Sequence, residues 1–201
     1  MPTGIALREA RVQLFDAAER VLLRDGPNGL TSRAVTTEAG CAKGVLHRHF
    51  ADFDTFLADL VADRVARLDD QAAALRGTAG TGIVVDNLTS ALIALFDSVA
   101  LGIVALVTSR HQLLARLRHT TPTGMPILTE ATAMIASYLA AERKLGRIAA
   151  DADVETIAPM LVGAGHLLFA GRPGGPTRAD AVHRAVATAL AGVLREPPTR
   201  P

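Results

Sequence analysis

The stretch EAGCAKGVLHRHF, residues 38–50, decides how the N-terminal part of this chain folds. Gly40 separates two short helical segments, and glycine readily adopts the positive backbone dihedral that a tight turn requires. After the turn, Leu46 and Phe50 stand one helical turn apart and form an apolar edge, while small and polar residues face outward. Two short helices joined by a glycine turn predict a helix-turn-helix, whose second helix can enter the major groove of DNA.

Helical periodicity continues on both sides of this stretch. Upstream, apolar residues at spacings of three to five predict a helix that ends near Gly26-Pro27. Thr31 or Ser32 can cap the next helix by accepting a hydrogen bond from a free backbone amide, and Asp52 or Asp54 can cap a longer helix after it. Further helices are expected near residues 84–108, 110–119, 126–145, 154–170 and 178–195.

The pattern as a whole predicts an all-α chain of about nine helices. We expect a three-helix helix-turn-helix domain over residues 1–52, a larger helical domain over 53–196 and a disordered tail over 197–201. The glycine-rich segment at 76–82 lacks the Gly-Lys-Ser/Thr that a phosphate-binding loop needs, so it is interpreted as a flexible joint.

Charge is close to balanced, which limits where nucleic acid could bind. The 201 residues are 49% hydrophobic and carry a net charge of +1, whereas a protein that coats nucleic acid along its whole length is far more basic. Residues 1–50 hold seven Lys/Arg against five Asp/Glu, and residues 51–201 hold fourteen against fifteen. Any contact with DNA is therefore expected to be local and N-terminal.

Several features favour a cytoplasmic location. Cys41 is the one cysteine, which excludes an intrachain disulfide and suits a reducing compartment. The N-terminus lacks the basic segment and apolar run of a secretory signal. The most apolar stretch, residues 91–107, is shorter than the roughly 20 apolar residues of a membrane span and contains Asp97, so a buried helix is the preferred interpretation.

The string G-x-x-x-L-T-S-R, followed by EAGCAKGVLHRHF, resembles the N-terminal domain of the TetR family of bacterial transcriptional repressors. The resemblance covers about residues 8–60; the rest of the chain matches the family only in its helical character and length. It implies a DNA-binding transcriptional regulator, most often a repressor, that binds a palindromic double-stranded DNA operator as a homodimer. It also implies that the C-terminal domain binds a small-molecule effector and forms the dimer.

The resemblance and the residue chemistry together assign the DNA contacts. Lys43 and Gly44 lie at the start of the recognition helix, where exposed amides attract phosphate and glycine permits close approach. Val45 can touch a thymine methyl group, and Arg33 matches a position that in some family members reaches a guanine edge. The expected DNA-binding residues are Thr31, Ser32, Arg33, Lys43, Gly44, Val45, His47, Arg48 and His49.

Three positions depart from the family pattern. His47 replaces a tyrosine that bonds a backbone phosphate, Ala42 replaces a common serine cap, and Phe53 stands where a phosphate-contacting lysine is usual. Imidazole can still donate one hydrogen bond to a phosphate, and the bond is stronger when the ring is protonated. We therefore expect a lighter grip on DNA that depends on pH.

The candidate ligand contacts in the C-terminal domain are mainly aliphatic. Aromatic residues make up 3% of the chain and tryptophan is absent, which disfavours an aromatic cage for flat cationic molecules. Asp97 is the main candidate acid, so a neutral or weakly acidic, largely aliphatic effector is expected. The expected ligand-binding residues are Leu92, Leu95, Phe96, Val99, Thr108, Leu114, Met134, Ser137, Tyr138, Leu161 and His166.

The two last helices carry the features of a subunit interface. Glycines in the first of them cost helix propensity, which suggests close helix packing, and the second carries an apolar stripe. In the family, these two helices form a four-helix bundle with a second subunit. The expected dimer contacts are Gly163, Leu167, Val182, Val186, Ala189, Leu190 and Val193.

The sequence gives little support for a metal site, a cofactor or enzymatic activity. The six histidines form no His-x-x-x-His or Cys-His cluster, so neither a metal site nor a cofactor is expected. No Gly-x-Ser-x-Gly elbow or evident pair of catalytic acids occurs, which disfavours an enzyme. Two alternatives stay open: a small helical enzyme, or a helical ligand- or protein-binding module that lost DNA binding through the substitutions at positions 42, 47 and 53.

Overall fold

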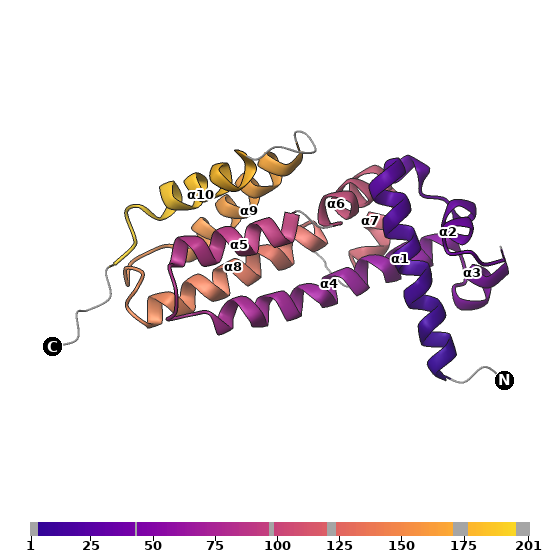
Figure 1. The fold of residues 1–201 in the computed structure, drawn as a ribbon, viewed down its shortest axis with the longest axis horizontal. Coiled ribbons are helices and arrows are strands. Elements are labelled where there is room, and N and C mark those ends of the chain that lie inside the picture. The colour runs from indigo at the N-terminus through magenta and orange to yellow at the C-terminus, as the bar shows by residue number, and fades with distance from the viewer. Residues whose placement is uncertain (1–3, 43, 97–98, 120–123, 171–176, 196–201) are drawn as a thin grey trace. The chain divides into compact units, whose positions relative to one another are not determined.

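The computed structural model describes residues 4–42, 44–96, 99–119, 124–170 and 177–195 of the chain. Within these ranges there are ten α-helices and one isolated β-bridge, between Ile148 and Leu194, which confirms the all-α prediction (Figure 1). The extra helix arises because the apolar stretch expected as one helix over 84–108 forms two, α5 (Val84–Phe96) and α6 (Ala100–Ser109). The tail expected at 197–201 lies outside the described residues.

The first helix, α1 (Gly4–Gly29), is interrupted where the sequence predicts its end. Gly26 has φ 71° and ψ −177°, outside the helical region, and Pro27 begins one further turn. Glycine tolerates this left-handed conformation and proline suits the first turn of a helix, so both residues favour an interruption of the helix at this point. The change of direction leads the chain into the helix-turn-helix.

Two short helices and one long helix follow. They are α2 (Ser32–Glu38), α3 (Gly44–His49) and α4 (Phe53–Gly77). The Asp52 carboxylate accepts a hydrogen bond from the Thr55 amide at 2.6 Å, which confirms an acidic cap at the start of α4. The remaining helices are α7 (His111–Leu117), α8 (Pro126–Lys144), α9 (Val154–Ala170) and α10 (Thr177–Leu190).

The chain forms two compact units. The first comprises Met1–Arg64 together with Gly102–Pro126, and the second comprises Val65–Leu101 together with Ile127–Pro201. The helix-turn-helix therefore shares its unit with α7 and most of α6, which follow it by more than fifty residues in the sequence. The functional boundary at residue 52 remains a prediction, because compactness and DNA binding are different criteria.

Aromatic packing forms the core of the first unit. Phe15 of α1, Phe50 after α3 and Phe56 of α4 are almost fully buried, with ring centroids 5.0 to 5.9 Å apart. A Cβ at Gly102 would lie 3.0 Å from the Leu22 side chain, so α6 packs closely on α1. Both contacts join segments that are distant in sequence.

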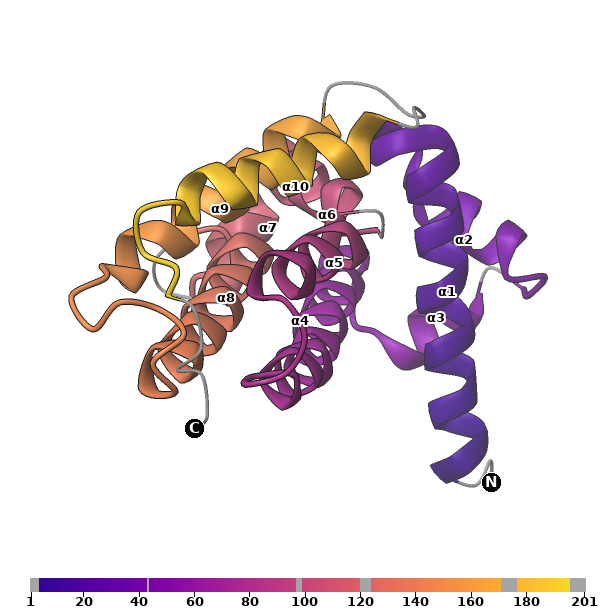
Figure 2. The same ribbon diagram turned by 60° about the vertical axis from the view of Figure 1, so that its left-hand side comes forward.

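In the second unit, α10 and α9 run side by side and both pack against α5 (Figure 2). A Cβ at Gly165 would lie 2.5 Å from the Phe96 ring, so glycine is what allows α9 to approach α5 this closely. No single described helix is both long and apolar enough to cross a membrane, although α5 and α6 pass that test together as a bent pair.

Candidate functional site

The turn between α2 and α3 has the geometry that the sequence predicts. The Thr31 hydroxyl accepts a hydrogen bond from the Ala34 amide at 3.1 Å, so Thr31 caps α2. Gly40 has φ 66°, and the amide of Cys41 donates to the Thr36 carbonyl at 3.0 Å. This is the hydrogen-bond pattern of a helix closed by a left-handed glycine, and it turns the chain sharply toward α3.

The inner face of α3 is anchored by contacts that only the structure reveals. Leu46 is fully buried, and the Arg11 guanidinium lies 4.6 Å from the centroid of the Phe50 ring. Arg11 also donates to Asp59 of α4 at 2.8 Å. The Gln13 side chain donates to the Ala39 carbonyl at 2.9 Å, which fixes α1 to the turn. Polar residues of α1 therefore help to orient the recognition helix.

The outer face of the helix-turn-helix carries most of the expected DNA contacts. Arg33, Gly44, His47 and Arg48 are exposed, whereas Val45, His49 and Ser32 are partly buried. Thr31 is exposed, and its hydroxyl already caps α2. Lys43 lies outside the described residues.

A concavity of about 310 Å³ lies beside α2. It is lined by Arg24, Thr31, Arg33, Ala34, Thr37 and Glu38. Glu38 accepts hydrogen bonds from Arg24 at 2.7 Å and Arg20 at 2.8 Å, and these bonds lower the pKa of its carboxyl. The Glu38 carboxylate beside Arg33 is therefore already paired with two other arginines, one of which, Arg24, also bonds Asp25.

The surroundings of His47 and Phe53 show what two of the residues that depart from the family pattern contact. His47 is exposed on α3, where its ring can meet a phosphate. Phe53 is partly buried and stacks on Phe56, with centroids 5.6 Å apart and an interplanar angle of 18°. The Arg110 guanidinium lies 5.7 Å from the centroid of the Phe53 ring. Position 53 therefore serves packing in this chain.

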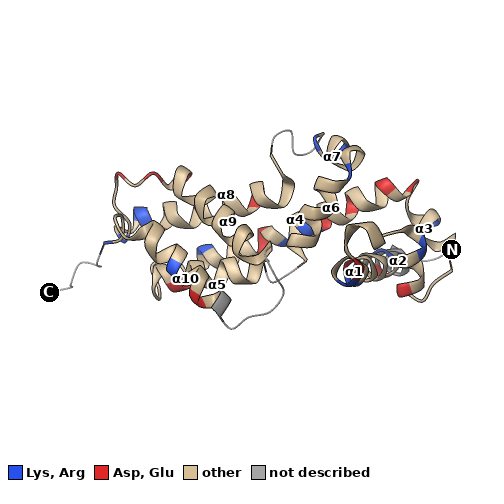
Figure 3. Cartoon of the chain, turned by 90° about the horizontal axis from the view of Figure 1, so that it is seen from above, with Lys and Arg blue, Asp and Glu red and all other residues tan. Residues whose placement is uncertain are grey.

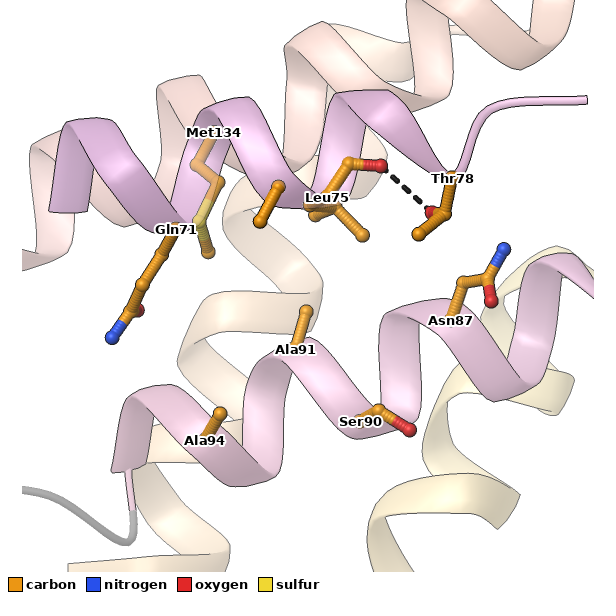
Figure 4. Close-up of a pocket in the computed structure, with 9 residues that line it drawn as sticks. Gln71, Leu75, Thr78, Asn87, Ser90, Ala91, Ala94 and Met134 are labelled. Atoms are coloured by element: carbon orange, nitrogen blue, oxygen red, sulfur yellow. Dashed lines mark hydrogen bonds between the residues drawn. The ribbon is translucent and has the colours of Figure 1, made fainter. Parts of the chain in front are cut away.

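An apolar groove of about 260 Å³ lies between α4, α5 and α8 in the second unit (Figure 4). Alanines at positions 74, 91 and 94 leave the space, and Leu75 and Met134 supply apolar walls. Among the residues that the structure describes, those that line the groove are all uncharged. The polar groups at its edge are carried by Gln71, Thr78, Asn87 and Ser90.

Met134 is the one expected ligand-binding residue that lines this groove. Leu92, Leu95, Phe96, Tyr138 and Leu161 are at most 1% exposed and form core, as does Val99 at 9%. The same helical spacing marks core and pocket residues, which is why the sequence did not separate them.

Four further ligand candidates have other surroundings. Thr108 and Leu114 belong to the first unit, and Ser137 is partly buried in the second. The His166 ring packs edge-on against Phe96 at 6.1 Å, and its Nδ1 is buried without a hydrogen-bond partner. Asp97, the expected acid, lies outside the described residues.

Tyr138 belongs to a buried polar network. Its hydroxyl donates to Glu142 at 2.6 Å and accepts from the Asn87 side chain at 3.0 Å. Burial and the bond to Glu142 raise the pKa of Tyr138 to about 12. Glu142 also accepts from the Gly80 amide at 3.2 Å and lies 3.5 Å from Arg147. The network secures the loop between α4 and α5, and both Thr78 of this loop and Asn87 of α5 line the groove.

The helix-turn-helix geometry agrees with a comparison against protein-family models. Residues 14–59 match the model of bacterial regulatory proteins of the tetR family. The matched residues comprise the helix-turn-helix together with parts of α1 and α4 on either side of it. No curated protein sequence matches the chain.

Solved structures extend the likeness to the whole fold. A protein described as a TetR-family transcriptional regulator from Mesorhizobium loti MAFF303099 aligns with a TM-score of 0.70 and 18% identity, over 94% of this chain and 98% of that one. A transcriptional regulator from Rhodococcus sp. Rha1 aligns at 0.69 and 20%, over 93% and 99%. The ketosteroid transcriptional regulator KstR2 of Mycobacterium tuberculosis aligns at 0.62 and 21%, over 92% and 95%.

The chain therefore has the fold of TetR-family transcriptional regulators. TetR-family regulators are generally non-enzymatic DNA-binding proteins. Among the residues that the structure describes, no three His, Cys, Asp or Glu side chains are grouped as metal ligands.

TetR-family regulators act as dimers, and the expected dimer residues fall into two groups. Val182, Val186 and Leu190 are at most 1% exposed, because α10 packs them against α5 and α9 of the same chain. Ala189 and Val193 are partly buried. Gly163 and Leu167 are exposed on α9, and Leu167 is 75% exposed. The stripe on α10 thus contributes to the chain's own core, and α9 retains the free apolar face.

Proposed function

We propose that this chain is a homodimeric, cytoplasmic repressor that a small, largely apolar effector releases from a palindromic operator. The observation that carries the proposal is the course of α4. This helix begins directly after the Asp52 cap that follows the recognition helix, and its last turns line the apolar groove with Gln71, Ala74 and Leu75. A molecule in the groove would therefore touch the helix that leads out of the DNA-binding domain.

The DNA-binding half is supported by the outer face of α2 and α3. Arg33, His47 and Arg48 project from a framework that is capped at Thr31 and anchored at Leu46. Arginine can bond a guanine edge with two hydrogen bonds, and imidazole can bond a phosphate. A two-fold dimer presents two such faces, so the operator should be a palindrome with half-sites about one helical turn apart.

The effector class is inferred from the groove. The described residues that line it are uncharged, so an ionic ligand would lose hydration without gaining an ionic partner among them. The amides of Gln71 and Asn87 and the hydroxyl of Ser90 can orient a neutral molecule through one or two hydrogen bonds. Coupling between effector and operator is typically about 1–3 kcal/mol, which changes operator affinity about 5- to 150-fold.

The dimer is supported by α9. Pro159, Met160, Gly163 and Leu167 are exposed along one side of this helix, and Met160 and Leu167 are 59% and 75% exposed. Contiguous apolar side chains on a surface usually mark a contact with another protein. A second copy of α9 is the partner that this proposal assigns to the face.

The first experiment is a gel shift with the DNA upstream of the protein's own gene, followed by titration of the complex with possible effectors. The panel contains an aliphatic lactone, a fatty acid, a ketosteroid and a cationic dye; the ketosteroid is included because one structural neighbour is a ketosteroid regulator. Release by a neutral apolar compound is expected. Selective release by the dye would contradict the proposed effector class, and absence of any DNA binding would favour the alternative of a non-DNA-binding module.

A substitution within the groove tests where the effector binds. Ala91→Leu should fill the space between α4 and α5, so that the protein still binds its operator but responds at least tenfold less to the active compound. Ala105→Leu is the matched control, because Ala105 is exposed on α6 and does not line the groove. Equal responses of both variants and the wild type, measured by gel shift and thermal shift, would place the effector elsewhere.

A further inference from the structure

Arg110 occupies the corner between α6 and α7, where its side chain is unusual for its position. It is the residue before α7, with an extended backbone (φ −122°, ψ 92°), and its side chain makes no cap hydrogen bond to the helix. Ser, Thr, Asp and Asn are preferred there because they satisfy free amides. An arginine gives up that local stabilisation, so its side chain should be explained by contacts elsewhere.

Those contacts reach two points in the N-terminal segment. The Arg110 guanidinium donates to the Leu30 carbonyl at 2.9 Å and lies 5.7 Å from the centroid of the Phe53 ring. Leu30 is fully buried, and a buried carbonyl requires a hydrogen-bond partner. The face of an aromatic ring attracts a guanidinium through its quadrupole. Both interactions depend on the shape of arginine as well as on its charge.

The two points enclose the helix-turn-helix. Leu30 directly precedes Thr31, the cap of α2, and Phe53 is the first residue of α4. One side chain therefore holds both the entrance and the exit of the segment that carries the recognition helix. All three residues belong to the first compact unit.

A second arginine of α7 contacts the exit. Arg116 donates to the Thr55 hydroxyl at 2.7 Å and lies 3.6 Å from the Asp52 carboxylate. Its side chain is 45% exposed, and exposed ion pairs contribute little to stability. Arg116 therefore adds a weaker contact to the start of α4, and Arg110 makes the main contacts to the helix-turn-helix segment. The basic residues of this segment are visible along α7 in Figure 3.

We propose that Arg110 is a positioning residue for DNA binding, which fixes the start of α2 relative to the start of α4 and thereby sets the orientation of α3. The proposal also accounts for Phe53: the ring that stands in place of a phosphate-contacting lysine is the platform on which Arg110 rests. The inference rests on the proposed function only in naming DNA as the ligand. The brace itself, defined here as Arg110 with Leu30 and Phe53, can be tested without DNA.

The test compares Arg110→Lys, which keeps the charge, with Arg110→Gln, which removes it, in the full-length chain. Arg118→Gln is the matched control, because Arg118 is exposed at the end of the same helix. The DNA is a palindromic duplex selected from a random library by the wild-type protein, with a scrambled duplex for non-specific binding. Affinities are measured over a range of salt concentrations, at a temperature where thermal unfolding shows every variant to be folded.

Both Arg110 variants should lose at least fivefold in affinity for the palindrome relative to the scrambled duplex, while the dependence on salt stays that of the wild type. A residue that bonds a phosphate instead contributes about 0.9 to the slope of log affinity against log salt concentration. A slope that shrinks by this amount in Arg110→Gln but not in Arg110→Lys would overturn the proposal in favour of direct contact with DNA. Unchanged relative affinity in both variants would overturn it as well.

Hydrogen exchange in the DNA-free protein separates failure of this inference from failure of the proposed function. Amides of α2 and α3 should exchange faster in both Arg110 variants than in wild type or Arg118→Gln, while those of α9 stay unchanged. If no duplex is selected but this exchange pattern is found, the proposed function fails and the brace stands. If the amides of α2 and α3 exchange at the wild-type rate in both Arg110 variants, the brace does not hold these helices, whatever the DNA result.

Discussion

At the scale of single residues, the outer face of the helix-turn-helix combines family features with local substitutions. His47 is exposed and can take the role of the family's tyrosine, whereas Phe53 cannot take the role of a lysine because its ring is packed on Phe56. Replacing Phe53 by lysine would remove the platform under Arg110 and place two positive charges together. Substitution at position 47 alone is therefore the cleaner test of the proposed contact with a DNA phosphate.

Arg33→Ala should cost roughly 1–3 kcal/mol of operator binding if the guanidinium bonds a base edge, and should relax preference at one base pair. Arg33 is exposed, and the nearby Glu38 carboxylate is engaged by Arg20 and Arg24. Affinities for a set of single-base operator variants measure the effect. Lys43→Ala, at an expected phosphate contact, should weaken all of them about equally; an unchanged preference in Arg33→Ala would remove its base-reading role.

His47→Ala should weaken binding to every DNA sequence about equally, because an imidazole that bonds a backbone phosphate reads no base. His47→Gln keeps a hydrogen-bond donor, so its loss of affinity should be smaller. Fluorescence anisotropy with labelled operator and a scrambled duplex at constant ionic strength measures both variants. Affinity of His47→Ala equal to that of the wild type would remove His47 from the phosphate contact.

At the scale of helices, the buried network around Tyr138 joins α5, α8 and the loop before α5. The hydroxyl bridges Asn87 and Glu142, and Glu142 in turn holds the Gly80 amide. A buried carboxylate needs such partners, because burial without them is costly. The groove therefore ends against a fixed loop on one side and small alanine side chains on the other.

The free energy of unfolding should fall as pH rises from 10 to 12. Tyrosine ordinarily ionises near pH 10, whereas burial and the bond to Glu142 raise the pKa of Tyr138 to about 12. The folded chain thus retains a proton that the unfolded chain releases, so stability is fully present below pH 10 and lost toward pH 12. Denaturant unfolding measures the decline, and phenolate absorbance follows the ionisation.

The control is Tyr138→Phe, which leaves Asn87 and Glu142 without the hydroxyl. It should be less stable than the wild type at pH 8, by about 1–3 kcal/mol for the unsatisfied partners. Its stability should decline less between pH 10 and 12, and an equally steep decline would contradict the assignment to this tyrosine. The assignment is direct because the chain contains one tyrosine.

Much of the element pattern follows from the sequence, because caps and breaks are local. Gly26, Gly40 and Thr31 have the conformations and bonds that their residue types predict. The candidate groove was harder to predict from the sequence, because Leu92 and Leu161, which lie in the core, have the same helical spacing as residues that line a pocket. The alanines that create the groove have no distinctive spacing. Likewise, the three-dimensional neighbours of Arg110 are about 60 to 80 positions away and leave no local pattern.

At the scale of the whole molecule, the proposed function requires a second copy of the chain. The proposed place for it is the exposed apolar side of α9, where Met160 and Leu167 are 59% and 75% exposed. One chain presents one recognition helix, whereas a palindrome engages two. Loss of the dimer should therefore weaken operator binding even when the DNA-binding domain is intact.

Leu167→Glu should convert the dimer into a monomer, because it replaces the most exposed leucine of the apolar face of α9 with a charged residue. Leu145→Glu is the matched control: Leu145 is also a largely exposed leucine, at 54% against 75%, but lies after α8. Sedimentation velocity gives the oligomeric state, and a gel shift gives operator binding. A Leu167→Glu variant that remains dimeric would exclude this side of α9 as the interface.

The inclusion of α6 and α7 in the N-terminal unit affects attempts to re-engineer DNA specificity. A chimera joined at residue 52 would treat the helix-turn-helix as an interchangeable cassette, yet Arg110 of the host would still meet the guest backbone at position 30, and Arg116 would meet the guest residue at position 52. A guest segment that extends one residue further and brings lysine to position 53 would set like charges against Arg110. Grafts that keep Phe53, or that transplant residues 102–126 with the head, should retain their specificity better than grafts that cut at the apparent linker.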